Sequence, residues 1–263
     1  MSKLGYLLLG TVLLSATTAT AAGAAERVIL DTDLGDDVDD AGTLAVFHAL
    51  ANRGAIIPLA VGIVNGNVNA VPLTDAINTW YGRPSLPVGT IKSGAPINHD
   101  TFEMGAIASQ YPHDLTQASA PEVVGLYRSI LAQQPDASVI LVVVGQATNI
   151  ANLLKSPPDA HSPLTGIELV RRKIKFYASG GNGRNTLPSG ASGWNYQNDR
   201  SAANYELLNF PDTIPMSEGG GDGLTMYAGS RYQQAPADHI IRKCYEAYFD
   251  GVARIATYGI SYA

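Results

Sequence analysis

The chain has 263 residues, of which 46% are hydrophobic and 15% charged, enough apolar material for one sizeable core. The net charge of -6 and the absence of a basic stripe argue against binding to a nucleic-acid backbone. The single cysteine, Cys244, excludes an intrachain disulfide and a cysteine-based metal site, and we expect it to be a small apolar side chain in a helix.

The N-terminal residues have the pattern of a targeting segment. Lys3 is followed by an apolar run at residues 4–14, which is too short to span a bilayer of roughly 30 Å. Small residues that suit cleavage come next. We expect residues 1–24 to be a secretory signal peptide and residues 25–263 to form one secreted or periplasmic domain that is not in the membrane after cleavage. A retained N-terminal anchor is the alternative.

Along the rest of the chain, apolar runs alternate with segments of helical spacing. In chain order we predict a strand at 28–30, a helix at 41–53, strand 56–64, helix 75–81, strand 86–88, helix 121–134, strand 138–144, helix 148–155, strand 173–178, a long loop at 180–198, and helices 199–208 and 239–249. This alternation predicts an α/β fold, with a Rossmann-like, mostly parallel sheet flanked by helices.

Several polar segments follow the predicted strands directly. They begin at Asp31, Asn65, Gly145 and Ser179. Ligands of parallel sheets bind beyond the carboxyl ends of the strands, so these segments could converge on one site.

The segment after the first strand carries six aspartates within ten residues, at 31, 33, 36, 37, 39 and 40. Two unit charges about 4 Å apart repel by roughly 4 kcal/mol at an effective dielectric of 20, so such a cluster needs protonation or a cation. Oxygen ligands suit Ca²⁺ or Mg²⁺. A solvated acidic loop with an aspartate helix cap is the alternative. An EF-hand does not fit, because Asp36 and Gly42 stand where it needs Gly and Glu.

The order of motifs resembles the nucleoside hydrolase family of the inosine/uridine-preferring type, and its exported branch in particular. Residues 31–41, Asp-Thr-Asp-Leu-Gly-Asp-Asp-Val-Asp-Asp-Ala, resemble the N-terminal signature of that family. Asn-Gly-Asn at 65–67, Gly-Gln-Ala-Thr-Asn at 145–149, Ser-Gly-Gly at 179–181 and the segment 195–203 resemble later motifs in the expected order.

The resemblance implies roles for particular residues. Asp33 and Asp40 would bind Ca²⁺ through their carboxylates, and Thr148 through its backbone carbonyl. Asp33 would also be catalytic and take a proton from the attacking water. The residues expected to hold the sugar are Asp39, Asn65 or Asn67, Asn185 and Asn195. The implied partner is a small-molecule nucleoside, and a homo-oligomer is left open.

Two positions depart from the family pattern. Gly193 stands where the family has a glutamate two residues before the matched asparagine. No acid follows Asp250, whereas the family has a last metal-binding aspartate near its C-terminus, so we expect a truncated or altered end. None of the five histidines matches a leaving-group acid, and we expect structural or surface roles for them.

Three functions compete at this stage. The first is Ca²⁺-dependent hydrolysis of the N-glycosidic bond of ribonucleosides, giving free base and ribose. The second is a catalytically impaired relative that binds a nucleoside or sugar. The third is a phosphatase that uses the Asp-x-Asp pair at 31–33, and it is disfavoured because Lys173 and Lys175 begin a predicted strand rather than end one.

Overall fold

The computed structural model describes residues 24–180, 193–219 and 230–257. Its centre is a sheet of six parallel strands in the order β3-β2-β1-β4-β5-β6. The strands are β1 (Glu26–Thr32), β2 (Ile56–Ile63), β3 (Val88–Thr90), β4 (Val139–Val143), β5 (Ile174–Ser179) and β6 (Met216–Glu218). The predicted parallel α/β sheet is confirmed.

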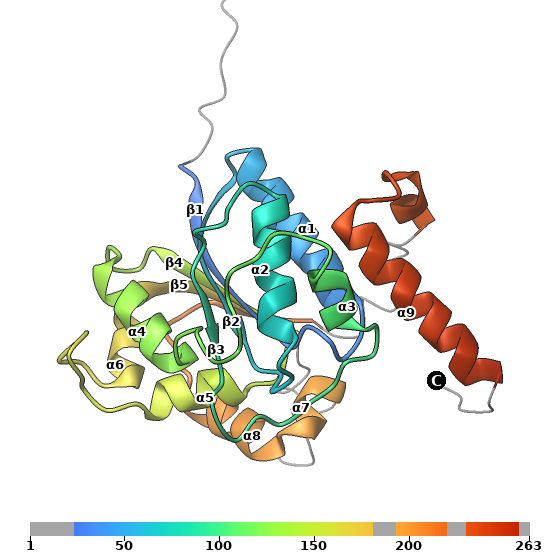
Figure 1. Cartoon of the computed structure of the whole chain (residues 1–263). Coiled ribbons are helices and arrows are strands. Elements are labelled where there is room, and N and C mark those ends of the chain that lie inside the picture. Colours follow the sequence, from blue (N-terminus) through green and yellow to red (C-terminus); the bar gives the residue numbers. More distant parts are fainter. Residues whose placement is uncertain (1–23, 181–192, 220–229, 258–263) are drawn as a thin grey trace, which may run out of the picture.

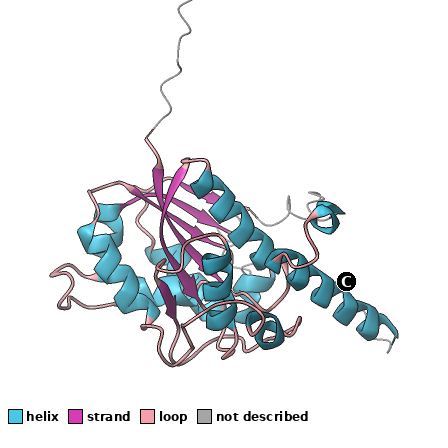
Figure 2. Ribbon diagram, turned by 45° about the horizontal axis from the view of Figure 1, so that its top comes forward, coloured by secondary structure: helices cyan, strands magenta, loops and turns pink. Residues whose placement is uncertain are grey.

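Helices cover both faces of the sheet (Figures 1 and 2). One face carries α1 (Asp39–Asn52) and α2 (Ala70–Trp80). Helices α3 (Met104–Ala108) and α9 (Ile240–Thr257) pack against these helices, and all four contribute to one apolar cluster. The other carries α4 (Val123–Gln133), α5 (Thr148–Lys155) and α6 (Gly166–Lys173), which share a second cluster. The short helices are α7 (Trp194–Asn198), α8 (Arg200–Asn209), which packs on α5, and the 3₁₀ turn η2 (Ser230–Gln234). Cys244 is buried in α9, as predicted.

The structure differs from the predicted elements at several boundaries. The third strand begins at Val88 instead of residue 86, because Pro87 has no N–H to donate to a ladder. Helix α2 begins at Ala70, before the predicted 75. Lys173 ends α6 and does not begin β5. The predicted loop at 180–198 contains α7 in its described part.

The N-terminal targeting prediction lies almost wholly in residues 1–23, outside the described residues. Among the residues that the structure describes, no helix is both long enough and apolar enough to cross a membrane.

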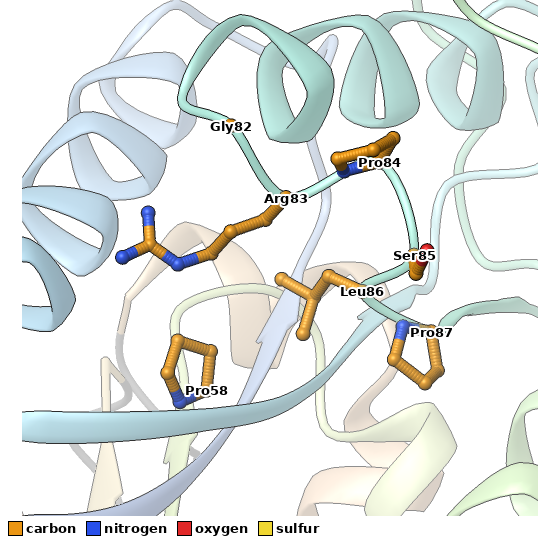
Figure 3. A pocket seen from close by; sticks show the side chains of 7 residues that line it. All are labelled: Pro58, Gly82, Arg83, Pro84, Ser85, Leu86 and Pro87. Atoms are coloured by element: carbon orange, nitrogen blue, oxygen red, sulfur yellow. The ribbon is translucent and has the colours of Figure 1, made fainter.

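The two ends of the parallel strands carry different side chains. The acidic segment follows the carboxyl end of β1. A surface pocket lies where β2 begins, lined by Pro58 and by residues 82–87 of the turn that leads to β3 (Figure 3). Arg83 is the charged side chain that lines this pocket, and no carboxylate does.

Candidate active site

Asp33 and Asp40 meet where β1 ends and α1 begins. Both side chains are almost fully buried. The hydroxyl of Thr32, the last residue of β1, donates to Asp40 Oδ1. Asp40 lies in the first turn of α1, where backbone N–H groups and the helix dipole favour negative charge. Strand end and helix start thus bring the two carboxylates together, as the sequence predicted.

Burial and mutual repulsion dominate the electrostatics of this acidic cluster, by which we mean Asp33, Asp37, Asp39 and Asp40. Burial raises the pKa of Asp33 to about 7 and that of Asp37 to about 8. Burial and then the neighbouring Asp33 raise the pKa of Asp40 well above its usual value, and the pKa of Asp39 is also raised. Four carboxylates in this state cannot all ionise unless a cation neutralises them.

The donor set fits a hard cation. Carboxylate oxygens of Asp37, Asp39 and Asp40 lie within 4.8 Å of one another, and Asp33 and Asp40 interact directly. All these donors are oxygens, which Ca²⁺ and Mg²⁺ prefer. Asp37 is a further oxygen donor beside the predicted Asp33 and Asp40. It is brought in by the turn at Gly35, whose φ of +113° favours glycine.

Thr148 is the first residue of α5. Its hydroxyl donates to Asp199 Oδ2 at 2.7 Å, which ties the start of α5 to the start of α8. The preceding turn passes close to the acidic cluster, because a Cβ at Gly145 would lie 2.7 Å from the Asp33 nitrogen. A role for the Thr148 carbonyl as a metal ligand stays a prediction.

The raised pKa values predict how the stability of the metal-free protein depends on pH. The folded protein keeps protons on these carboxyls up to about pH 7–8, whereas the unfolded chain releases them near the ordinary aspartate pKa of 3.8. The folded state therefore binds more protons across this window, so the free energy of unfolding falls as pH rises. We expect the melting temperature in chelator to decrease from about pH 5 to about pH 8. Asp37→Asn should flatten the curve. A melting temperature that rises across this window would contradict the electrostatics described.

Asp31 is not part of the acidic cluster, contrary to our expectation that it would converge with the other aspartates. Its side chain is fully buried toward α4 and α5, where Oδ2 accepts from Tyr127 Oη at 2.5 Å and Asn149 Nδ2 at 2.8 Å. Burial raises the pKa of Asp31 to about 7. The tyrosine needs the space beside Gly62, where a Cβ would lie 1.6 Å from Oη. Asp31 therefore fastens the two helices to β1.

Removal of the Tyr127 hydroxyl should destabilise the fold. In Tyr127→Phe the buried carboxyl of Asp31 loses one of its two partners, and we expect the free energy of unfolding to fall by about 1–3 kcal/mol. Urea denaturation measures this change. Tyr205→Phe, at a partly buried tyrosine of α8, is the control. Equal losses in the free energy of unfolding for the two substitutions would show that the hydrogen bond to Asp31 does not stabilise the fold.

Asn65 serves the loop around the site in this structure. It is fully buried, and its Nδ2 donates to the carbonyls of Leu34 at 3.0 Å and His99 at 2.8 Å. Its Oδ1 accepts from the backbone N–H groups of Asn67 and His99. A contact with a sugar would have to replace these bonds. Asn67 is therefore the better placed of the two predicted asparagines, since within the described part of the chain its side chain makes one hydrogen bond, from the Asn69 N–H to Oδ1.

Gln146 links Asp33 to Asn195. Its Nε2 donates to Asp33 Oδ2 at 2.6 Å and to Asn195 Oδ1 at 3.2 Å. Asn195, in the first turn of α7, donates from Nδ2 to the Val144 carbonyl at 2.6 Å. Asn195 thus reaches the site as predicted. The bridging role of Gln146 was not predicted, because its position in the turn after β4 carries no sign of a partner on α7.

The rim of the cluster is built around Asp36. Its carboxylate accepts from His99 Nδ1 at 2.5 Å and from Trp194 Nε1. The Trp194 side chain is 59% exposed, so an aromatic surface stands open at the edge of the site. His99, which we expected to be an ordinary structural or surface residue, joins this rim.

Two predicted features of the α7 region have different outcomes. Asn185 lies within 181–192, outside the described residues. Gly193 is described, and its φ of +107° is a conformation that a glutamate at this position would rarely adopt.

A comparison with protein-family models identifies the family to which the chain belongs. The family model described as inosine-uridine preferring nucleoside hydrolase matches residues 28–217, which is most of the described sheet and the whole acidic segment. The chain belongs to the inosine-uridine preferring nucleoside hydrolase family. This is a family of metal-dependent N-glycosyl hydrolases, and the acidic cluster lies in the segment that carries its signature.

Solved structures agree with the family assignment at the level of the fold. A purine-preferring ribonucleoside hydrolase from Gardnerella vaginalis is 19% identical, with a TM-score of 0.57 over 89% of this chain and 75% of that one. The Bacillus anthracis inosine-uridine preferring enzyme is 17% identical, with a TM-score of 0.54 over 88% and 83%. The type III effector XopQ, solved with adenosine diphosphate ribose, is 17% identical, with a TM-score of 0.65 over 90% and 70%. No curated protein matches the chain.

Proposed function

We propose that this protein is a Ca²⁺-dependent nucleoside hydrolase that splits the N-glycosidic bond of ribonucleosides into free base and ribose. Family membership and fold support hydrolysis of this bond. The observation that carries the proposal is Asp33, a buried carboxylate that touches Asp40 and has one oxygen held by Gln146. A buried carboxylate beside the proposed cation site is placed to take a proton from a water held there.

Each residue of the site has a separate role in the proposed reaction. Asp33 accepts the proton of the attacking water, and Asp40, with Asp33, Asp37 and the Thr148 carbonyl, would hold the cation. Bound Ca²⁺ would lower the pKa of the water and orient it. Asp39, Asn67 and Asn195 would hold the ribose hydroxyls. The carboxylates favour the positive charge that develops on the sugar as the base departs.

The phosphatase alternative lacks support at the site. That chemistry needs a lysine near the carboxyl ends of the strands. Lys173 ends α6, and Lys175 lies near the start of β5, where its ammonium pairs with Glu26 at 2.6 Å. Glu26 begins β1, so both lysines are at the opposite end of the strands from Asp33. Lys92 follows β3 at the carboxyl end, but its ammonium donates to the carbonyls of Gln117 and Ala118.

A substrate panel tests the proposed function. The full chain is incubated with inosine, uridine, adenosine and their 2′-deoxy forms at saturating Ca²⁺ in phosphate-free buffer. We expect free base and free pentose in equal amounts, with the ribonucleosides faster because Asp39 and the asparagines contact hydroxyls. Absence of base release from every nucleoside, by protein shown to be folded, would overturn the proposal. Release that requires added phosphate would overturn it as well.

A further inference from the structure

The Gln146 amide lies at the centre of a hydrogen-bond chain whose direction is fixed at one end. The Val144 carbonyl can only accept, so Asn195 must point Nδ2 toward it, at 2.6 Å. The carboxamide oxygen of Asn195 then faces Gln146. Because that oxygen can only accept, Gln146 must donate to it from Nε2, at 3.2 Å. The second hydrogen of that nitrogen is left for Asp33 Oδ2, at 2.6 Å.

These hydrogen bonds prevent Gln146 from turning its carboxamide oxygen toward Asp33. A flipped amide would place two acceptors, Gln146 Oε1 and Asp33 Oδ2, against each other and would leave Asn195 Oδ1 without its donor. In the observed orientation Oε1 has no hydrogen-bond partner among the described residues. Exchanging Oε1 and Nε2 would lose both hydrogen bonds that the amide donates.

We propose that Gln146 is a positioning residue, which holds one oxygen of Asp33 and so aims the other at the proton it must take. Because Asn195 lies on α7, the same bond couples the placement of α7 to the orientation of Asp33. The inference rests on the proposed function, since it assigns a task within that reaction.

Steady-state kinetics of Gln146→Met provides the first test. Methionine has a similar length but no donor. We expect kcat to fall about tenfold to a hundredfold, which is the equivalent of one hydrogen bond to a charged group, while KM changes less than about threefold. Asn195→Ala combined with Gln146→Met should lower kcat by less than the product of the single effects. Gln110→Met, which removes an exposed glutamine, is the control and should match the wild type.

Side-chain amide NMR gives a readout that does not need turnover. The Gln146 NεH₂ signals are identified by their loss in Gln146→Met. We expect them to shift in Asp33→Asn and in Asn195→Ala but not in Gln110→Met. Gln146→Asn, one methylene shorter but equally polar, serves if the methionine variant does not fold, and it should lose kcat as well.

The outcomes separate this inference from the proposed function. Amide signals indifferent to Asp33→Asn and Asn195→Ala overturn the inference, whatever the activity. A rise in KM with unchanged kcat also overturns it, because Gln146 would then serve sugar binding. If the signals shift as expected but the wild type hydrolyses no nucleoside, the hydrogen-bond chain stands and the proposed function fails.

Discussion

Asp33→Asn is expected to lower kcat for nucleoside hydrolysis by about 10³-fold, since general-base catalysis contributes roughly 10²–10⁴-fold. The amide cannot take a proton from water, although it can still accept the hydrogen bond from Gln146. The carboxylate also adjoins Asp40, so the substitution should weaken the cation site. The measurement is therefore made at saturating Ca²⁺, so that the lost proton acceptor and not lost metal is scored.

Asp114→Asn is the matched control, because Asp114 is an exposed aspartate whose substitution leaves the acidic cluster intact. Its kcat should equal that of the wild type. If Asp33→Asn kept a kcat within about tenfold of the wild type, another group would have to be the base, and the assignment of Asp33 would be wrong.

Ca²⁺ should raise the melting temperature by about 5–10 °C. A ligand present at one hundred times its Kd stabilises the folded state by about 2.7 kcal/mol, and each kcal/mol is worth about 2–4 °C for a domain of this size. The physical reason is that the cation relieves the repulsion among Asp33, Asp37, Asp39 and Asp40, which exists only in the folded state. Differential scanning calorimetry during a Ca²⁺ titration measures the shift.

Asp40→Asn should remove most of this shift. Asp40 interacts with Asp33, and its carboxylate also lies within 4.8 Å of those of Asp37 and Asp39. Without metal the variant should melt higher than the wild type at about pH 8, since one buried charge is gone. Asp114→Asn should keep the full Ca²⁺ response. Equal responses of wild type and Asp40→Asn would show that the cation binds elsewhere.

The sequence predicted the parts of the fold that depend on local pattern. Apolar runs such as 138–144 produce the central strands, and a polar residue after such a run must lie at the carboxyl edge of a parallel sheet. The pattern placed the aspartate segment at that end of the sheet, whereas the roles of Asp33 and Asp40 came from the family resemblance and stay predictions. Helix α6 was not predicted, although Thr165 and Glu168 form a capping box, which is a local signal for the start of a helix.

The missed contacts join segments far apart in the sequence. Tyr127 reaches Asp31 across 96 positions, and Gln146 reaches Asp33 across 113. Composition and spacing carry no record of such pairs. Asn65 illustrates the converse, because a motif identifies an asparagine but cannot tell whether its amide faces a ligand or the backbone. Strand β6 was missed because its three residues carry no apolar run.

The central claim is that the acidic cluster at the end of β1 holds a cation that makes N-glycosidic hydrolysis possible. The most direct measurement is the rate of base release from inosine or uridine by the full chain in solutions that hold free Ca²⁺ at a series of fixed concentrations. We expect negligible release in chelator. As free Ca²⁺ is raised, the rate of release should rise to saturation over the same range of Ca²⁺ concentrations as the melting temperature. A rate that is independent of Ca²⁺, or no release at full Ca²⁺ occupancy, would contradict it.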